Sequence, residues 1–235
     1  MDLSKQLEFV WSVRGPLLEG LAISVCIAFF ALIMGFIIGV ILAMIKIMPQ
    51  KSIISKILNK FADVYITVIR GTPLLVQLLI MYNVVLVSFK YMQFSLPIPI
   101  ITFGINSGAY MAEIIRSGIN SIDKGQLEAG RSLGLSWGKS MFKIVIPQAI
   151  KVVIPTIFNE IIILVKETSV VCYIAIHIGV NQVWDLLGVA ENIGTYNAWA
   201  YMALIFTVAI MYLILVLLLT FIQKLIERRL SKNER

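Results

Sequence analysis

Charged residues are scarce in this 235-residue sequence: Lys, Arg, Asp and Glu make up 14% of it, whereas hydrophobic residues make up 59%. A water-soluble domain typically has about 25% charged residues. The mean hydropathy of +0.92 is typical of a chain embedded in a lipid bilayer. Because a membrane-spanning helix takes about 20 apolar residues, several spans fit this length and little remains for a soluble domain. The deficit of charge therefore excludes most soluble enzyme classes.

Cysteine and histidine are also nearly absent. Cys26 and Cys172 each lie in an apolar stretch without a second thiol or a histidine at metal-ligand spacing, so we expect both to be apolar packing residues. His177 is the one histidine of the sequence. A zinc site or a Cys/His nucleophile therefore has almost no residues from which to form. An intramembrane enzyme, which needs a nucleophile with a base or a metal cluster, finds no support in these residues.

Long charge-free runs predict the membrane spans, because each can cross about 30 Å of hydrocarbon as a helix. A further apolar run contains charged residues that a lipid-facing helix would not carry, and we count it as a span as well. The paired prolines at 97 and 99 cannot lie inside a helix and mark the entry to the third span. The sequence thus predicts an all-α membrane protein with five transmembrane helices. The runs are 21–45, 71–89, 91–112, 152–184 and 192–223.

The basic residues predict the orientation in the membrane. Fifteen of the 20 Lys and Arg residues fall in the first loop, the third loop and the C-terminal tail. With five spans these segments share one side, which the positive-inside tendency makes cytoplasmic. We predict an N-terminus outside and a C-terminus in the cytoplasm, and no nucleic-acid partner. The first loop has Lys46, Lys51, Lys56 and Lys60, and the outer side has Lys5, Arg14 and Lys90.

The loop between the third and fourth spans, residues 118–146, has the pattern of a short amphipathic helix and a turn. Asp123 is placed to cap the start of this helix, and Gly134 to end it in the left-handed conformation. Ser136 then caps the next helix, and Pro147 begins the fourth span. Such a helical hairpin presents a rigid surface to another protein. A helical connector without a partner is the alternative.

The stretch 134–140, GLSWGKS, resembles the phosphate-binding loop G-x-x-x-x-G-K-[ST] but does not match it. Only three residues separate its two glycines, and Leu133 stands where the first glycine is required. No apolar strand precedes the loop. We therefore expect no nucleotide binding by this chain.

The same loop carries a more specific resemblance. Glu128-Ala129-Gly130, three residues, Gly134, nine residues and Ile144-Val-Ile-Pro147 resemble the cytoplasmic E-A-A-x3-G-x9-I-x-L-P signature of membrane subunits of bacterial ABC importers. Gly130 replaces the second alanine and Ile146 replaces the leucine. Further stretches resemble the polar amino-acid permease branch, and the resemblance runs from about residue 65 to 180. These stretches are 70–77 (RGTPLLVQ), 109–118 (AYMAEIIRSG), 147–149 (PQA), 159–160 (NE) and 166–169 (KETS).

The resemblance implies one importer transmembrane domain over residues 1–235, in the bacterial cytoplasmic membrane. It implies a permease that pairs with a second copy or a related chain and takes polar amino acids, or a derivative such as cystine, from an extracellular solute-binding protein. ATP and magnesium would bind a separate ATP-binding subunit, and this chain would hold no cofactor. The coupling helix would dock on that subunit through Glu128, Ala129, Gly130 and Gly134.

Charged residues within the predicted spans are candidates for substrate contact, because an ionisable residue in a membrane needs a partner. Glu160 follows Pro155, where a broken or kinked helix could expose backbone groups, and its carboxylate could receive a substrate ammonium group. Lys166 could meet a substrate carboxylate, and Glu167 lies on the same helix face as Glu160. Asn159 adjoins Glu160 but points about 100° away. Interhelical ion pairs with Arg70, Glu113 or Arg116 are the alternative.

Polar residues in other spans are further candidates for the pathway. Asn106 and Tyr110 share a face of the third span, and Thr72 and Gln77 bring polar groups to the second. Interhelical hydrogen bonds would explain them equally well. Gly35 and Gly39 form a G-x-x-x-G face for close packing, within the subunit or across a dimer.

A self-sufficient secondary transporter or channel remains the competing reading of the whole chain. A secondary carrier would favour an inverted repeat with paired broken segments. Five spans show no convincing internal repeat. We therefore favour the ATPase-driven permease.

Overall fold

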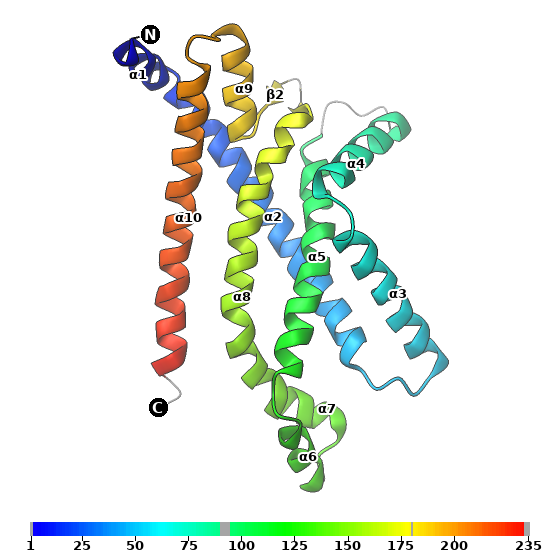
Figure 1. Ribbon diagram of the computed structural model, residues 1–235. Coiled ribbons are helices and arrows are strands. Elements are labelled where there is room, and N and C mark those ends of the chain that lie inside the picture. The colour runs from blue at the N-terminus through cyan, green and yellow to red at the C-terminus, as the bar shows by residue number, and fades with distance from the viewer. Residues whose placement is uncertain (1, 90–94, 180, 233–235) are drawn as a thin grey trace.

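The computed structural model describes residues 2–89, 95–179 and 181–232. Most of this chain is helical, and the longest helices form a bundle (Figure 1). Lys90 and the predicted start of the third span at Tyr91 lie outside the described residues. Cys26 and Cys172 are half-buried free thiols.

The two ends of the bundle differ. Helix α1 (Leu3–Ser12) lies across one end. Helices α6 (Lys124–Ser132) and α7 (Trp137–Ser140) protrude from the other end, where α10 (Tyr201–Lys232) also finishes (Figure 1). The described chain therefore begins and ends at opposite ends of the bundle, as an odd number of crossings requires.

Four helices of the described chain are long and apolar enough to cross a membrane, and a bent helix pair makes a fifth if it counts as one span. The predicted number of crossings is compatible with this count. Helix α5 begins at Pro97, where the paired prolines predicted an entry. The four helices are α2 (Arg14–Ile47), α5 (Pro97–Asn120), α8 (Ile146–Glu167) with its flanking turns, and α10.

The second predicted span, 71–89, covers only the second half of a bent helix pair. The structure has two helices here, α3 (Ile53–Arg70) and α4 (Leu74–Phe89), and the pair bends by 103° at Gly71–Pro73. The search for charge-free runs missed α3, because this helix carries Lys56, Lys60 and Asp63. Asp63 forms an ion pair with Lys46 of α2. The first loop is therefore much shorter than predicted.

Helix α8 runs without interruption through Pro155, so the expected break is absent there. It follows the π-helical turn η1 (Met141–Val145) and ends in the 3-10 helix η2 (Thr168–Tyr173). The helical part of the fourth predicted span is thus complete before residue 184. The predicted span was too long because it was defined by apolar composition, and a buried strand is as apolar as a helix.

Besides its helices the described chain has a short β-hairpin, β1 (Ile176–Ile178) paired with β2 (Asn181–Val183), which the sequence did not predict, while the fold is mainly helical as expected. Gly179 in its turn has φ +64°. Ser95, just before α5, accepts a hydrogen bond from His177 N at 2.8 Å and donates to Ala175 O at 3.0 Å. Each strand has three residues, which is too few for an alternation of apolar and polar residues to be recognised in the sequence.

Helix α9 (Leu186–Tyr196) is separate from α10, so the fifth predicted span also begins too early. Asp185 caps α9 by accepting from Leu187 N at 3.0 Å and Gly188 N at 3.3 Å. Ser24 of α2 accepts from Leu186 N at 3.0 Å, which fastens this end of α9 to α2. Asp185 is 1% exposed. Burial raises the pKa of this carboxyl to about 7, against the lowering effect of its hydrogen bonds.

The core lies mainly between α2 and α5. Gly35 and Gly39 of α2 face Ser107 and Met111 of α5 so closely that a Cβ at either position would enter van der Waals space. Small residues permit such close contact in membrane helices. The G-x-x-x-G face therefore packs within the subunit.

Candidate functional site

Glu160 lies buried in the middle of the bundle. Its side chain on α8 is beside Ser107 of α5, and the charges of Arg70 and Glu167 act on it. Glu160 is 7% exposed, and the structure gives it no ion-pair partner within 4.0 Å among the described residues. A buried carboxylate without a paired cation is costly and is a candidate for ligand contact.

Ser107 was not among the residues selected from sequence. It is 0% exposed, and its Oγ makes no well-formed hydrogen bond within the described chain. Gly35 of α2 lies against it, since a Cβ at position 35 would be 2.9 Å from Ser107 Oγ. A serine in an apolar helix gives little signal in the sequence, because only the packing of α8 against α5 brings it to Glu160.

Three predicted residues form one hydrogen-bonded network at the α3–α4 bend. The amide nitrogen of Gln77 donates to Ile69 O at 2.8 Å, Thr72 O at 3.1 Å and Thr72 Oγ1 at 2.7 Å. Its oxygen accepts from Asn106 Nδ2 of α5 at 3.0 Å. A bend exposes carbonyl groups that have no water in the membrane interior. Thr72, Gln77 and Asn106 therefore stabilise the bend.

Tyr110 lies under the guanidinium of Arg70, with 5.2 Å from Cζ to the ring centroid. Further along α5, Arg116 forms an ion pair at 2.7 Å with Glu113 of the same helix. Arg70 thus lies among groups of α5 and near Glu160 of α8. The sequence analysis did not select Arg70 as a candidate for substrate contact.

A polar groove of about 360 Å³ runs along α5 and α8 on this side. It contains charged, hydroxyl and small residues and includes Thr156, one turn of α8 before Glu160. It provides a surface that a polar solute can follow. Its polar members are Arg70, Glu113, Ser117, Ser121 and Thr156.

Other candidates lie elsewhere. Asn159 is exposed and accepts from Gln223 Nε2 of α10 at 3.2 Å, on a different face of α8 from Glu160. Lys166 is exposed, and Glu167 is half-buried at the end of α8. The structure therefore groups Glu167 electrostatically with Glu160, but it separates Asn159 from it.

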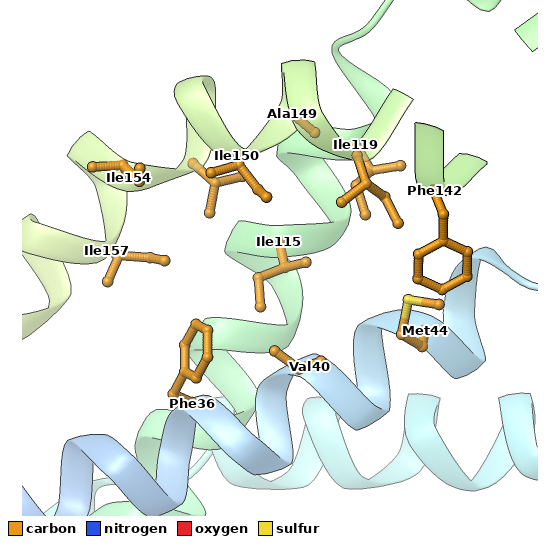
Figure 2. A pocket seen from close by; sticks show the side chains of 12 residues that line it. Phe36, Val40, Met44, Ile115, Ile119, Phe142, Ala149, Ile150, Ile154 and Ile157 are labelled. Carbon is orange, nitrogen blue, oxygen red and sulfur yellow. The ribbon is translucent and has the colours of Figure 1, made fainter. Parts of the chain in front are cut away.

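A second groove, of about 390 Å³, is wholly apolar. Figure 2 shows its side chains converging from α2, α5 and α8. It offers no polar group to a charged solute, in contrast to the groove that includes Arg70 and Glu113. Its labelled residues are Phe36, Val40, Met44, Ile115, Ile119, Phe142, Ala149, Ile150, Ile154 and Ile157.

The protruding hairpin has the capped geometry that its sequence predicts. Asp123 accepts from Gly125 N at 2.8 Å at the start of α6. At its end, Leu135 N donates to Gly130 O at 3.1 Å and Gly134 N to Arg131 O at 3.0 Å. This is the Schellman arrangement, and Gly134 adopts φ +82° as it requires.

The hairpin exposes Glu128, Ala129 and Gly134, and its Leu133 is 82% exposed. The position of Gly130 contradicts the expectation that this residue faces a partner. It is buried, and a Cβ there would lie 2.7 Å from Ile144 Cδ1 and 2.9 Å from Ser140 Oγ. Glycine at this position therefore lets α6 approach its own chain.

Within the described chain, no group of three or more His, Cys, Asp or Glu side chains is arranged to hold a metal ion. The ionisable residues of the site act singly or in pairs.

Comparisons with known proteins agree with this arrangement. Residues 35–232 match the family described as "Binding-protein-dependent transport system inner membrane component". The arginine transport system permease protein ArtQ of Bacillus subtilis (strain 168) is 40% identical over 222 residues, which cover 93% of this chain and 94% of that protein. The glutamine transport system permease protein GlnP of Escherichia coli (strain K12) is 33% identical over 230 residues, covering 96% and 99%.

A crystal structure of an amino acid ABC transporter with histidines superposes with a TM-score of 0.83 at 34% identity, covering 97% of this chain and 99% of that one. The resemblance inferred from the loop motif and the flanking stretches is thereby confirmed. The chain belongs to the binding-protein-dependent transport system inner membrane components, and it is a multi-pass permease subunit of the inner membrane.

Proposed function

We propose that this chain is the membrane-spanning subunit of an ATP-driven importer for polar amino acids. The names of the relatives, which refer to arginine and glutamine transport, support the substrate class. Residues 1–235 act as a single transmembrane domain and pair with a second copy or a related permease. ATP and magnesium bind a separate ATP-binding subunit.

The observation that carries this proposal is the exposed α6–α7 hairpin at the end of the bundle (Figure 1). It is the coupling element, and its end of the bundle faces the cytoplasm. Glu128 and Ala129 contact the ATP-binding subunit, together with Leu133. Gly134 shapes the turn, and Gly130 fixes α6 to η1. The N-terminal end faces outward and receives substrate from an extracellular solute-binding protein.

The substrate passes along the polar groove, and Glu160 binds its ammonium group. Arg70 is better placed than Lys166 for the carboxylate, because its charge acts on Glu160 and it lines the groove. Tyr110 holds the Arg70 side chain. Glu167 adds negative charge near Glu160, whereas Thr72, Gln77 and Asn106 support the bend and Asn159 supports α10.

Movement of the hairpins when ATP closes the partner subunits would rock the helices as semi-rigid bodies. This opens the groove alternately to each side. The continuous α8 and the tight α2–α5 contact provide the rigid parts. Transport then needs no chemistry by this chain.

Two measurements test the proposal. Uptake of labelled arginine, glutamine and cystine into cells that express this chain and its neighbouring genes gives the substrate. Glu160→Gln is expected to reduce uptake at least tenfold, since a hydrogen bond to a charged group contributes about 1.5–3 kcal/mol and about 1.4 kcal/mol corresponds to tenfold. Glu8→Gln, which changes an exposed carboxylate of α1, is the control. Uptake by Glu160→Gln equal to that of the control removes Glu160 from the substrate site.

Coupling is tested by co-purification with the ATP-binding subunit. The double variant Glu128→Ala/Leu133→Ser is expected to lose the subunit. Tyr196→Ser removes a side chain that is also 82% exposed but lies at the last residue of α9, towards the opposite end, and this variant is expected to retain the subunit. Solute transport by the purified chain alone, driven by an ion gradient, would instead support a secondary transporter.

A further inference from the structure

Helix α1 has a surface that the transport proposal does not use. It lies across the end of the bundle, and Val13 with φ −97° and ψ 12° separates it from the spanning helix α2 (Figure 1). Asp2 caps its start by accepting from Ser4 N at 3.2 Å. It is therefore a distinct helix with its own set of faces.

One face of α1 packs on the bundle. Gln6 Nε2 donates to Trp199 O at 2.9 Å, and the rings of Phe9 and Trp199 lie 5.1 Å apart. Val10 and Val13 pack on the cluster that α9 and α10 form with Leu17. These contacts hold α1 at a set angle and fix which of its residues point away.

A second face is apolar and exposed. Leu3 is 66% exposed, Leu7 58% and Trp11 70%. Their spacing of four residues aligns them in one stripe, because each residue turns a helix by about 100°. By the same turn, the stripe is centred about 110° from the packed face, and Ser4, Glu8 and Ser12 form a polar third face.

Arg14 marks one end of this stripe. Its Cζ lies 4.7 Å from the centroid of the Trp11 ring, and its Nη1 donates to Trp11 O at 2.8 Å. Tryptophan is enriched at the membrane–water interface, and arginine binds phosphate oxygens through several N–H groups. The pair thus combines an apolar anchor with a phosphate-binding cation.

We propose that α1 lies in the lipid interface of the leaflet at its end of the bundle, with Leu3, Leu7 and Trp11 among the acyl chains and Arg14 at the phosphates. Helix α2, which follows α1 directly in the chain, also has exposed apolar side chains, among them Leu18 at 58% and Phe29 at 56%. Such side chains form the surface that a spanning helix shows to lipid. The polar face of α1 then meets water, as in other helices that lie in the interface plane.

Spin labels on adjacent residues provide the test. Leu7→Cys and Glu8→Cys are each labelled in full-length protein in which Cys26 and Cys172 are replaced by alanine. The protein is placed in vesicles of phosphatidylcholine and phosphatidylglycerol at a ratio of about 7:3, the anionic lipid supplying phosphate partners for Arg14. Collision with oxygen reports lipid, and collision with a water-soluble nickel chelate reports water.

At position 7 the ratio of oxygen to nickel collisions is expected to exceed that at position 8 at least fivefold. Equal, water-like ratios at both positions overturn the proposal. Protection of position 7 from both reagents also overturns it, because a protein then covers the stripe. A second measurement avoids labels: brominated lipid should quench the Trp11 part of the fluorescence, taken as wild type minus Trp11→Phe, by half or more. No quenching of this difference contradicts lipid insertion.

Discussion

Gln77 of α4 accepts a hydrogen bond from Asn106 of α5, with 3.0 Å between Oε1 and Nδ2. Through its amide nitrogen the same side chain also donates to Ile69 O, just before the bend, and to Thr72 O within it. One glutamine thus joins three helices. The bend depends on a side chain that follows it in sequence and on a helix about 30 residues away.

Gln77→Ala should therefore destabilise the protein by about 1–3 kcal/mol, because carbonyl groups at the bend lose their donor inside the membrane. Thermal unfolding in lipid nanodiscs measures the change. Asn83→Ala is the matched control, since the only hydrogen bond of the Asn83 amide among the described residues is to Leu79 O of its own helix. Equal unfolding temperatures for the two variants would contradict this role.

Gly39→Ala should destabilise the α2–α5 contact by about 1–3 kcal/mol. The added Cβ would lie inside van der Waals distance of Met111 Cβ and 3.0 Å from Ala112 N, so one helix must move. Gly15→Ala in the same helix meets nothing within 4 Å and should be neutral or slightly stabilising. The same unfolding measurement distinguishes them. If both variants unfold at the same temperature, the close contact of α2 with α5 does not require glycine at position 39.

Gly134→Ala should strain the hairpin turn by about 1–2 kcal/mol, because φ +82° is unfavourable for a residue with a Cβ. We expect faster hydrogen exchange across 124–140 and weaker stimulation of the partner ATPase. Gly138→Ala, at a position with open space and no positive φ, should change neither. Normal stimulation by Gly134→Ala would show that the turn does not need its glycine.

Asp185→Asn should reduce the pH dependence of stability between pH about 4 and 7. The folded-state pKa of Asp185 is about 7, above its ordinary 3.8. Its contribution to stability is therefore complete below about pH 4 and is lost as pH rises through 7. Asparagine does not titrate, and its single amide oxygen can accept one of the two backbone hydrogen bonds, which lie on different oxygens of Asp185.

Unfolding of wild type and Asp185→Asn at pH 4.5, 6 and 7.5 checks this prediction. The difference between the two proteins isolates Asp185 from other groups that titrate in the same range. We expect the variant to gain stability relative to wild type as pH rises. Parallel curves would mean that the carboxyl stays ionised in the folded protein.

Features that depend on short stretches of chain were predictable. Apolar runs require helices in a membrane because each backbone group must find a partner nearby. The caps at Asp123 and Ser136 and the left-handed Gly134 follow from residues within one turn. The ion pair of Glu113 and Arg116 also follows from their spacing of three.

Long-range contacts were not predictable from one sequence. Charges concealed α3, because the pairing of Asp63 with Lys46 depends on two helices meeting. Sequence placed Glu160 on a buried helix, but only the packing of α5 on α8 brought Ser107 to it. Likewise, the contacts of Gly130 with η1 and of Asn159 with α10 could be seen only in the tertiary structure.

The sequence by itself determined that this protein crosses a membrane and carries a capped loop between two spans, since apolar length and capping act over a few residues. Tertiary structure alone decided which polar side chains share a groove and which tie helices together. A helix offers each side chain several directions, and the neighbour that it meets depends on how distant segments pack.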